Sequence, residues 1–160
     1  MPAGDVREID PDSAPPEARI VSGEILFVSA TLKDQLLEFA KENKIPVVQR
    51  VDLWALITEP FLDTEFSSAE QEKTIQKLEE NGVTREECAV VRKEISHLVC
   101  AYNAFFWEWV HLGLADVLCA VRKNYLTQLR GLSKKQYEQF YKESMELANR
   151  GQVRTRIASD

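Results

Sequence analysis

The sequence is poor in the residues and motifs on which most enzymes depend. It has six glycines and two histidines, and no glycine-rich loop that could cradle a phosphate or a dinucleotide. The nucleophile motif Gly-x-Ser-x-Gly is absent as well. Both histidines, His97 and His111, fall in one hydrophobic segment, which disfavours a Ser–His or Cys–His pair. The sequence therefore favours a protein that is not an enzyme, and we expect no cofactor.

Cysteine is scarce too, and its spacing matches no zinc or redox motif. The three residues are Cys88, Cys100 and Cys119. On one helix, Cα atoms 12 residues apart are roughly 18 Å from each other, whereas a disulfide needs about 4.4–6.8 Å. The sequence thus predicts buried free thiols in a reducing compartment.

A long uncharged hydrophobic run is also missing. The one membrane candidate, residues 98–120, carries Glu108 near its centre, and its uncharged part, 98–107, is too short to cross a bilayer. The first 19 residues lack the basic and apolar regions of a signal peptide. We therefore expect a buried core helix here and a cytoplasmic protein that does not enter the membrane.

Charge is unevenly distributed along this acidic chain, whose net charge is −6. Residues 1–121 carry 11 basic and 22 acidic side chains, and residues 122–160 carry 9 basic and 4 acidic ones. The acidic balance argues against general nucleic-acid binding, because phosphate contacts need Lys and Arg. A phosphate-binding face on the basic C-terminal segment is one interpretation, and attraction to the acidic remainder of the chain is the simpler one.

The expected fold is all-α, a bundle of about five helices in one domain over residues 20–150. Four of the six prolines lie within residues 1–19, which predicts a disordered N-terminal arm. The polar end of the chain, 151–160, is predicted to be a flexible tail. The β-branched residues of Ile20–Val28 leave a short strand open as an alternative to helix.

Helix boundaries are indicated by capping residues and by prolines. Two helices are predicted over about Thr31–Lys44 and Val48–Thr58, each ending before a proline. Three further starts follow from pairs with the spacing of a capping box: Ser67 with Glu70, Thr84 with Glu87, and Ser133 with Gln136.

The central helix is the longest of these predictions. From Thr84, apolar residues recur at intervals of four and three as far as Leu112, and the pattern continues past Gly113 to Val121. Gly113 is the place where a break is expected, if there is one, because glycine costs about 1 kcal/mol in a helix interior. The middle of this helix, 98–107, is apolar on every side and should be surrounded by the other helices.

The strongest candidates for a metal site lie on the same helix. Glu94 with His97 and Glu108 with His111 both have the spacing Glu-x-x-His, which di-iron bundles use on facing helices. Here the two pairs are 14 residues apart, or roughly 21 Å on one helix. Only a sharp break or an antiparallel homodimer could bring them to one metal, so a solvated or ion-paired strip is the favoured interpretation.

An aromatic run next to these residues supplies candidate interface anchors. Trp107 and Trp109 point to opposite sides of the polar strip on a helix, and tryptophan is common at binding hot spots. Most of the run is expected to be core.

Three functions follow from these observations. The favoured one is a non-enzymatic interaction or inhibitory protein, whose acidic helical body binds another protein. The second is a helical enzyme that binds a metal or small ligand through Glu94, His97, Glu108 and His111. The third is a nucleic-acid-associated factor that uses the basic C-terminal helix. A homodimer is also expected to be feasible, since a long aromatic helix is a ready self-association surface.

Overall fold

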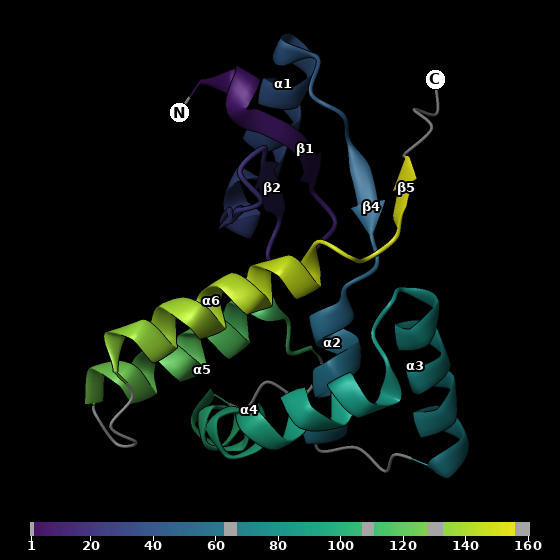
Figure 1. Cartoon of the computed structure of the whole chain (residues 1–160). Helices are drawn as coiled ribbons and strands as arrows, with labels where there is room; N and C mark the ends of the chain where they lie inside the picture. The colour runs from purple at the N-terminus through teal and green to yellow at the C-terminus, as the bar shows by residue number, and fades with distance from the viewer. Residues whose placement is uncertain (1, 63–66, 107–110, 128–132, 156–160) are drawn as a thin grey trace. The chain divides into compact units, whose positions relative to one another are not determined.

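The computed structural model of the chain describes residues 2–62, 67–106, 111–127 and 133–155, with the backbone alone over 101–106, 123–127 and 155. These residues form six α-helices and five β-strands, so the fold is mixed α/β (Figure 1). The prediction of an all-α bundle is therefore wrong. The chain divides into two compact units, which we call the sheet unit (Met1–Val51 with Gly151–Asp160) and the helical unit (Asp52–Arg150), where one helical domain was expected.

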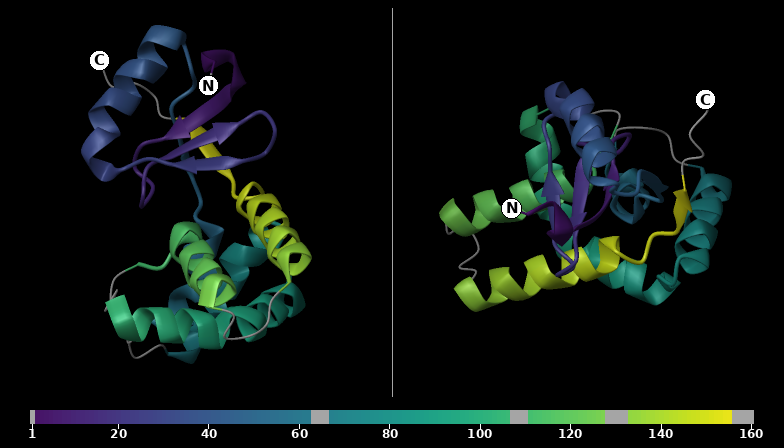
Figure 2. Two further views of the ribbon diagram at one scale, coloured as in Figure 1. Left: turned by 90° about the vertical axis from the view of Figure 1, so that its left-hand side faces the viewer. Right: turned by 90° about the horizontal axis from the view of Figure 1, so that it is seen from above.

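The sheet unit is a small antiparallel sheet with one helix on it. The strands β1 (Val6–Asp10), β2 (Glu17–Ile20) and β3 (Ile25–Phe27) are hydrogen-bonded in that order. The helix α1 (Lys33–Asn43) lies along one face of the sheet (Figure 2). There, Leu36 and Ala40 join the core formed by Ile9 and Ala18, which are directly opposite each other on β1 and β2. Short 3-10 turns precede β1 (Ala3–Asp5) and α1 (Ala30–Leu32).

The strands β1 and β2 lie largely within residues 1–19, so the prediction of a disordered N-terminal arm is wrong. Three of the prolines that suggested disorder, Pro11, Pro15 and Pro16, lie in the connection between β1 and β2. Proline cannot donate a ladder hydrogen bond, so its place beside the strands is the expected one. The third strand, β3, confirms the alternative of a short strand within residues 20–28.

Buried ion pairs explain how such highly charged strands can be part of a core. Glu8, which lies across from Arg19 in the β1–β2 register, is buried and accepts a hydrogen bond of 2.5 Å from Arg50 Nη2. Arg19 donates to Glu17 at 2.7 Å. Burial by itself would raise the pKa of the Glu8 carboxyl, but the hydrogen bond and charge of Arg50, with a smaller effect of Arg7, outweigh burial and hold this pKa below its ordinary value.

A second, two-stranded sheet joins β4 (Val48–Arg50) to β5 (Val153–Thr155) in antiparallel order. The strand β5 contradicts the predicted flexible tail over 153–155, and residues 156–160 of that prediction lie outside the described residues. The strand β4 contradicts the predicted helix over 48–58. Of the helix, only α2 (Leu53–Thr58) forms, because the side chain of Asp52 caps its start by accepting a hydrogen bond from the Ala55 amide.

The approach to β5 requires a glycine at position 151. The guanidinium of Arg50 donates from Nη1 to the Gly151 carbonyl, and a Cβ atom on Gly151 would overlap the carbonyl oxygen of Val51. This close approach fixes the point at which the C-terminal segment returns to the sheet unit.

The helical unit contains the other helices: α3 (Ser68–Glu80), α4 (Arg85–Phe106), α5 (Leu114–Thr127) and α6 (Lys134–Ala148). A 3-10 turn, Glu59–Phe61, follows α2. The predicted starts of α3 and α6 are confirmed as complete capping boxes, at Ser67 with Glu70 and at Ser133 with Gln136. The Thr84 hydroxyl likewise accepts a hydrogen bond from the Glu87 amide at 3.1 Å.

The prediction of one continuous helix over 84–112 is wrong, because residues 111–113 are not helical and a new helix, α5, begins at Leu114. Asp116 marks the new start, since its carboxylate accepts a hydrogen bond of 3.0 Å from the Gly113 amide. The segment before it is held by α2, where the hydroxyl of Thr58 donates to the Leu112 carbonyl at 2.5 Å. The periodic pattern of apolar residues therefore continues through a position where the helix is interrupted, and the hydrogen bonds of Thr58 and Asp116 fix that position.

Replacing Thr58 with valine should loosen this break. Thr58 is fully buried, so the variant leaves the Leu112 carbonyl without its donor, at a cost of about 1–2 kcal/mol in unfolding free energy. Urea unfolding measures the loss, and hydrogen exchange over 111–117 should speed up. Thr31→Val, at an exposed position, is the control and should change stability by less than about 0.5 kcal/mol. An equal effect of both variants would contradict this role of Thr58.

The short helix α2 is the element on which the helical unit converges. Its residues Leu53, Trp54, Ile57 and Thr58 are all buried. The indole of Trp54 donates to the Ser144 carbonyl on α6 at 3.1 Å. Arg92 on α4 donates from Nε to the Ile57 carbonyl at 2.8 Å, which also places a cation at the C-terminal end of α2. Within the described residues, no helix has the length and apolar character that a membrane crossing requires.

Candidate functional site

The predicted metal ligands are distributed over different elements. Glu94 and His97 lie one turn apart on α4, Glu94 exposed and His97 half-buried. His111 lies beyond the end of α4, and its Nε2 is 3.1 Å from the Oδ2 of Asp52, the capping residue of α2. Glu108 is outside the described residues, and among those that are described no group of three His, Cys, Asp or Glu side chains is arranged to hold a metal.

The predicted interface anchors, Trp107 and Trp109, also lie outside the described residues. The cysteines are only in part where they were expected. All three are free thiols, but Cys88 alone is buried, and burial raises the pKa of its thiol. Cys100 and Cys119 are exposed, which shows that α4 is not enclosed on every side at Cys100.

A concave surface of the helical unit lies between α4 and α6, and we call it the α4–α6 groove. It forms because α5 packs against both of these helices and keeps them apart. A cavity of about 480 Å³ and an adjoining one of about 210 Å³ make up the groove, and both are lined by Glu94, Phe140 and Glu143. The volume of the larger cavity is within the range of pockets that bind ligands.

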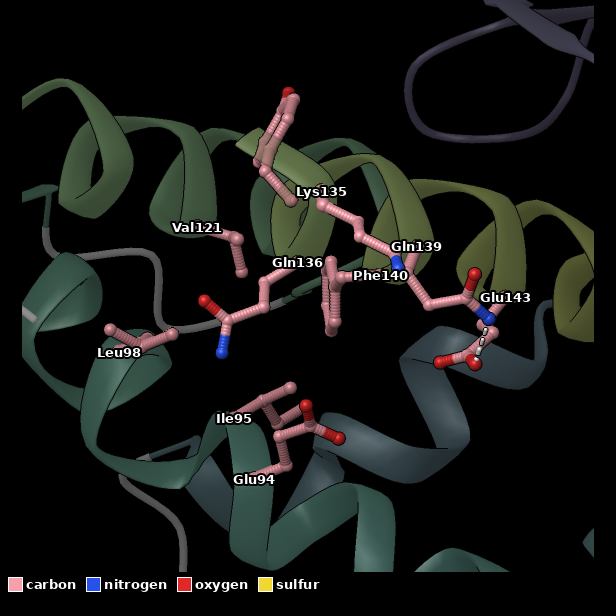
Figure 3. Close-up of a pocket in the computed structure, with 10 residues that line it drawn as sticks. Glu94, Ile95, Leu98, Val121, Lys135, Gln136, Gln139, Phe140 and Glu143 are labelled. Carbon is pink, nitrogen blue, oxygen red and sulfur yellow. Dashed lines mark hydrogen bonds between the residues drawn. The ribbon is translucent and has the colours of Figure 1, made fainter. Parts of the chain in front are cut away.

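The floor of the groove is apolar, and its edges carry carboxylates on both helices together with the cations Lys135 and Arg150. Ile95 and Leu98 of α4, Val121 of α5 and Phe140 of α6 form the floor of the larger cavity, and Trp54 of α2 lines the smaller one. In the close-up, the carboxylates of Glu94 and Glu143 face the space beside the Phe140 ring from opposite helices (Figure 3). An apolar floor with charged edges is suited to an amphipathic occupant.

Each helix presents one continuous stripe of side chains to the groove. The stripe on α4 recurs every three or four residues and consists of Glu87, Val90, Val91, Glu94, Ile95 and Leu98. Such spacing places successive side chains on one face of a helix. Val90 is 65% exposed, so the stripe includes apolar surface that the protein itself leaves uncovered.

The basic residues of α6 do not form the uniform positive face that nucleic-acid binding would favour. Lys134 and Lys142 lie within 3.6 and 3.8 Å of Glu138 and Glu146, one turn further along the helix. Arg150 pairs with Glu87 of α4 at 2.8 Å. Only the pair of Arg150 with Glu87 joins the basic C-terminal segment to the acidic remainder of the chain, as the simpler interpretation expects, whereas Lys134 and Lys142 pair within α6.

The groove contains residues that the sequence analysis did not select. Phe140 and Glu143 lie in α6, whose start was predicted correctly, but nothing in the sequence indicates that their face of α6 lies opposite α4. The sequence does contain a periodic signal. Gln136, Phe140, Glu143 and Leu147 recur at intervals of four and three, which places an aromatic and an acidic side chain one turn apart on one face of the helix. The partner of that stripe became visible only with the fold. Comparison of the chain with protein-family models, with curated proteins and with solved structures gave no match.

Proposed function

We propose that the protein is a non-enzymatic interaction protein whose α4–α6 groove binds an amphipathic, basic helix of another protein. The observation that supports this best is the combination of an apolar floor with carboxylates on both edges of one groove. Recognition of a helix in a groove uses the same combination, in which apolar anchors fill the floor and charges at the edges set the specificity.

The dimensions of the groove fit a helix of about three turns. From Glu87 to Leu98 the α4 stripe covers 11 residue steps, which is about 17 Å along a helix axis. The bound helix would lie beside α4 and α6 and cover Ile95, Leu98 and Phe140. Burial of apolar area would supply most of the affinity, because exposed ion pairs contribute little.

Charge favours a different protein over a second copy of this chain as the occupant. In a two-fold symmetric dimer the same patch lies on both sides of the interface, so the acidic edges of two grooves would face each other. A basic partner avoids this repulsion, and the net charge of −6 would steer it towards the protein. The three free thiols are in keeping with the cytoplasm as the proposed compartment.

A designed peptide with the chemistry of the proposed occupant tests the proposal directly. The probe is a helical peptide of about 14 residues, with leucines on one face and lysines beside them. We expect saturable binding in the micromolar range, measured by fluorescence anisotropy, that weakens as salt is raised. Amide chemical-shift changes should fall on 87–98 and 136–150 and not on α1 or α3.

The control peptide carries glutamate at every lysine position and should not bind. The control protein is Glu38→Gln/Glu42→Gln, which removes two exposed carboxylates of α1 and should bind the lysine peptide as the unmodified protein does. Shift changes scattered over both units, or no saturation up to about 1 mM, would contradict the proposed function.

A further inference from the structure

Six charged residues line the α4–α6 groove, and four of them form two pairs one heptad apart, while Lys135 and Glu146 are the other two. On α4 the acids are Glu87 and Glu94, seven residues apart. Opposite them lie Glu143 of α6 and Arg150, which is also seven residues further on and follows the end of α6. The two helices run in opposite directions along the groove, because the smaller cavity brings Glu87 near Arg150 and both cavities bring Glu94 near Glu143. The groove therefore has two successive charge pairs. The first joins opposite charges, and the second joins like charges.

The first pair is complete within the protein. Arg150 Nη1 donates to both carboxylate oxygens of Glu87, at 2.8 and 2.9 Å. It shows that a cation is accommodated at this level of the groove, with the side chain of Arg150 about 41% exposed. Charge-assisted hydrogen bonds of this length are the stronger kind.

The second pair consists of two carboxylates, and Lys135, which lines the same cavity, forms no ion pair with either of them among the described residues. Among the described residues neither Glu94 nor Glu143 takes part in an ion pair, and Glu143 accepts a hydrogen bond of 2.5 Å from the neutral amide of Gln139. Like charges on facing elements repel, so this level of the groove stabilises a cation that comes from outside.

A buried hydroxyl adds a separate polar group beside this pair. Ser144 lines the smaller cavity next to Phe140 and Glu143, and it is only 2% exposed. Its Oγ has no hydrogen-bond partner among the residues that the structure describes. A buried hydroxyl without a partner costs free energy, and a donor that enters the cavity would recover it.

From these features we infer that the groove selects partners with one Lys or Arg side chain that inserts between Glu94 and Glu143. Its aliphatic stem would pack on the Phe140 ring, and its cation would complete the second pair as Arg150 completes the first. This inference rests on the proposed function and specifies the chemistry of the partner's anchor residue.

The test uses two peptides that differ in one side chain. Both are helical and apolar on one face, and the central polar position carries either lysine or norleucine, which lacks the charge. The unmodified protein should bind the lysine peptide about tenfold more tightly than the norleucine peptide. The variant Glu94→Gln/Glu143→Gln should bind both peptides equally well, whereas Glu38→Gln/Glu42→Gln should keep the tenfold preference.

A charge reversal strengthens the design. In Glu143→Lys the protein supplies the cation opposite Glu94, so the preference for the lysine peptide should disappear while norleucine binding is retained. Equal binding of both peptides to the unmodified protein, at the groove, would overturn the inference and leave the proposed function standing. Absence of binding by either peptide would overturn both. Circular dichroism of each variant shows whether it is folded.

Discussion

Replacement of Arg50 by methionine is expected to destabilise the sheet unit by about 3 kcal/mol. The side chain of Arg50 is only 8% exposed, and that of Glu8, its partner, 11%. Methionine fills similar space but cannot pair with the Glu8 carboxylate, which stays buried. The remaining cation is then Arg7, whose Nη2 lies 3.4 Å from that carboxylate. Removing one partner of a buried ion pair costs about 3–5 kcal/mol, and the remaining Arg7 places this case at the lower end. The Gly151 carbonyl also loses its donor.

Hydrogen exchange is the suitable measurement, because every tryptophan and tyrosine of the chain lies within residues 52–150. Optical signals from these residues report on the helical unit alone. Amides of β1 and β2 should exchange about 100-fold faster in Arg50→Met. The control is Arg7→Met, which removes the exposed partner of the same carboxylate and should cost under about 1 kcal/mol. Similar effects of the two variants would show that burial of the pair is not what matters.

The pH dependence of this effect has a definite sign. The pKa of Glu8 is lower in the folded protein than in the unfolded chain, where the carboxyl has its ordinary value. A group of this kind contributes stability above the unfolded pKa, and the contribution is lost as the pH falls through the folded pKa. The deficit of Arg50→Met should therefore be complete near about pH 7 and shrink towards about pH 3. A deficit that grows on acidification would contradict the assignment.

The capping residues show what could be predicted from the sequence. Ser67 with Glu70 and Ser133 with Gln136 are local signals, because each pair satisfies backbone donors within one turn. Such signals do not depend on the rest of the chain, and the structure confirms the helix starts that they predicted. Asp52 and the pair Gly113 with Asp116 are signals of the same kind that the apolar pattern around them obscured.

The sheet unit shows what could not be predicted. The strand Val6–Asp10 carries three charged side chains, and it can be buried only because Arg50 pairs with Glu8 from 42 residues away. A prediction from hydrophobic periodicity places charged residues in solvent, so it takes this strand for part of a polar, disordered arm. Likewise, the α4–α6 groove depends on which faces of two separate helices meet. Both features follow from non-local pairing, which no single segment of sequence specifies.

The second large effect is expected at Trp54, where α2 joins the floor of the groove. Trp54 is 2% exposed, donates its indole N–H to the Ser144 carbonyl at 3.1 Å, and packs on Phe140 with ring centroids 6.4 Å apart. Trp54→Ala leaves a cavity where α2 meets α6 and should lower the unfolding free energy of the helical unit by about 3–5 kcal/mol. Urea unfolding followed by far-ultraviolet circular dichroism measures the change.

Two further variants separate the contributions at this position. Trp54→Phe keeps a ring against Phe140 but has no N–H for the Ser144 carbonyl, so its cost should be only about 1 kcal/mol. Val90→Ala, on the exposed stripe of α4, should cost less than about 0.5 kcal/mol. If Trp54→Ala cost as little as Val90→Ala, α2 could not be the element that supports the groove. The graded series of costs would instead show that the shortest helix of the unit anchors its longest ones.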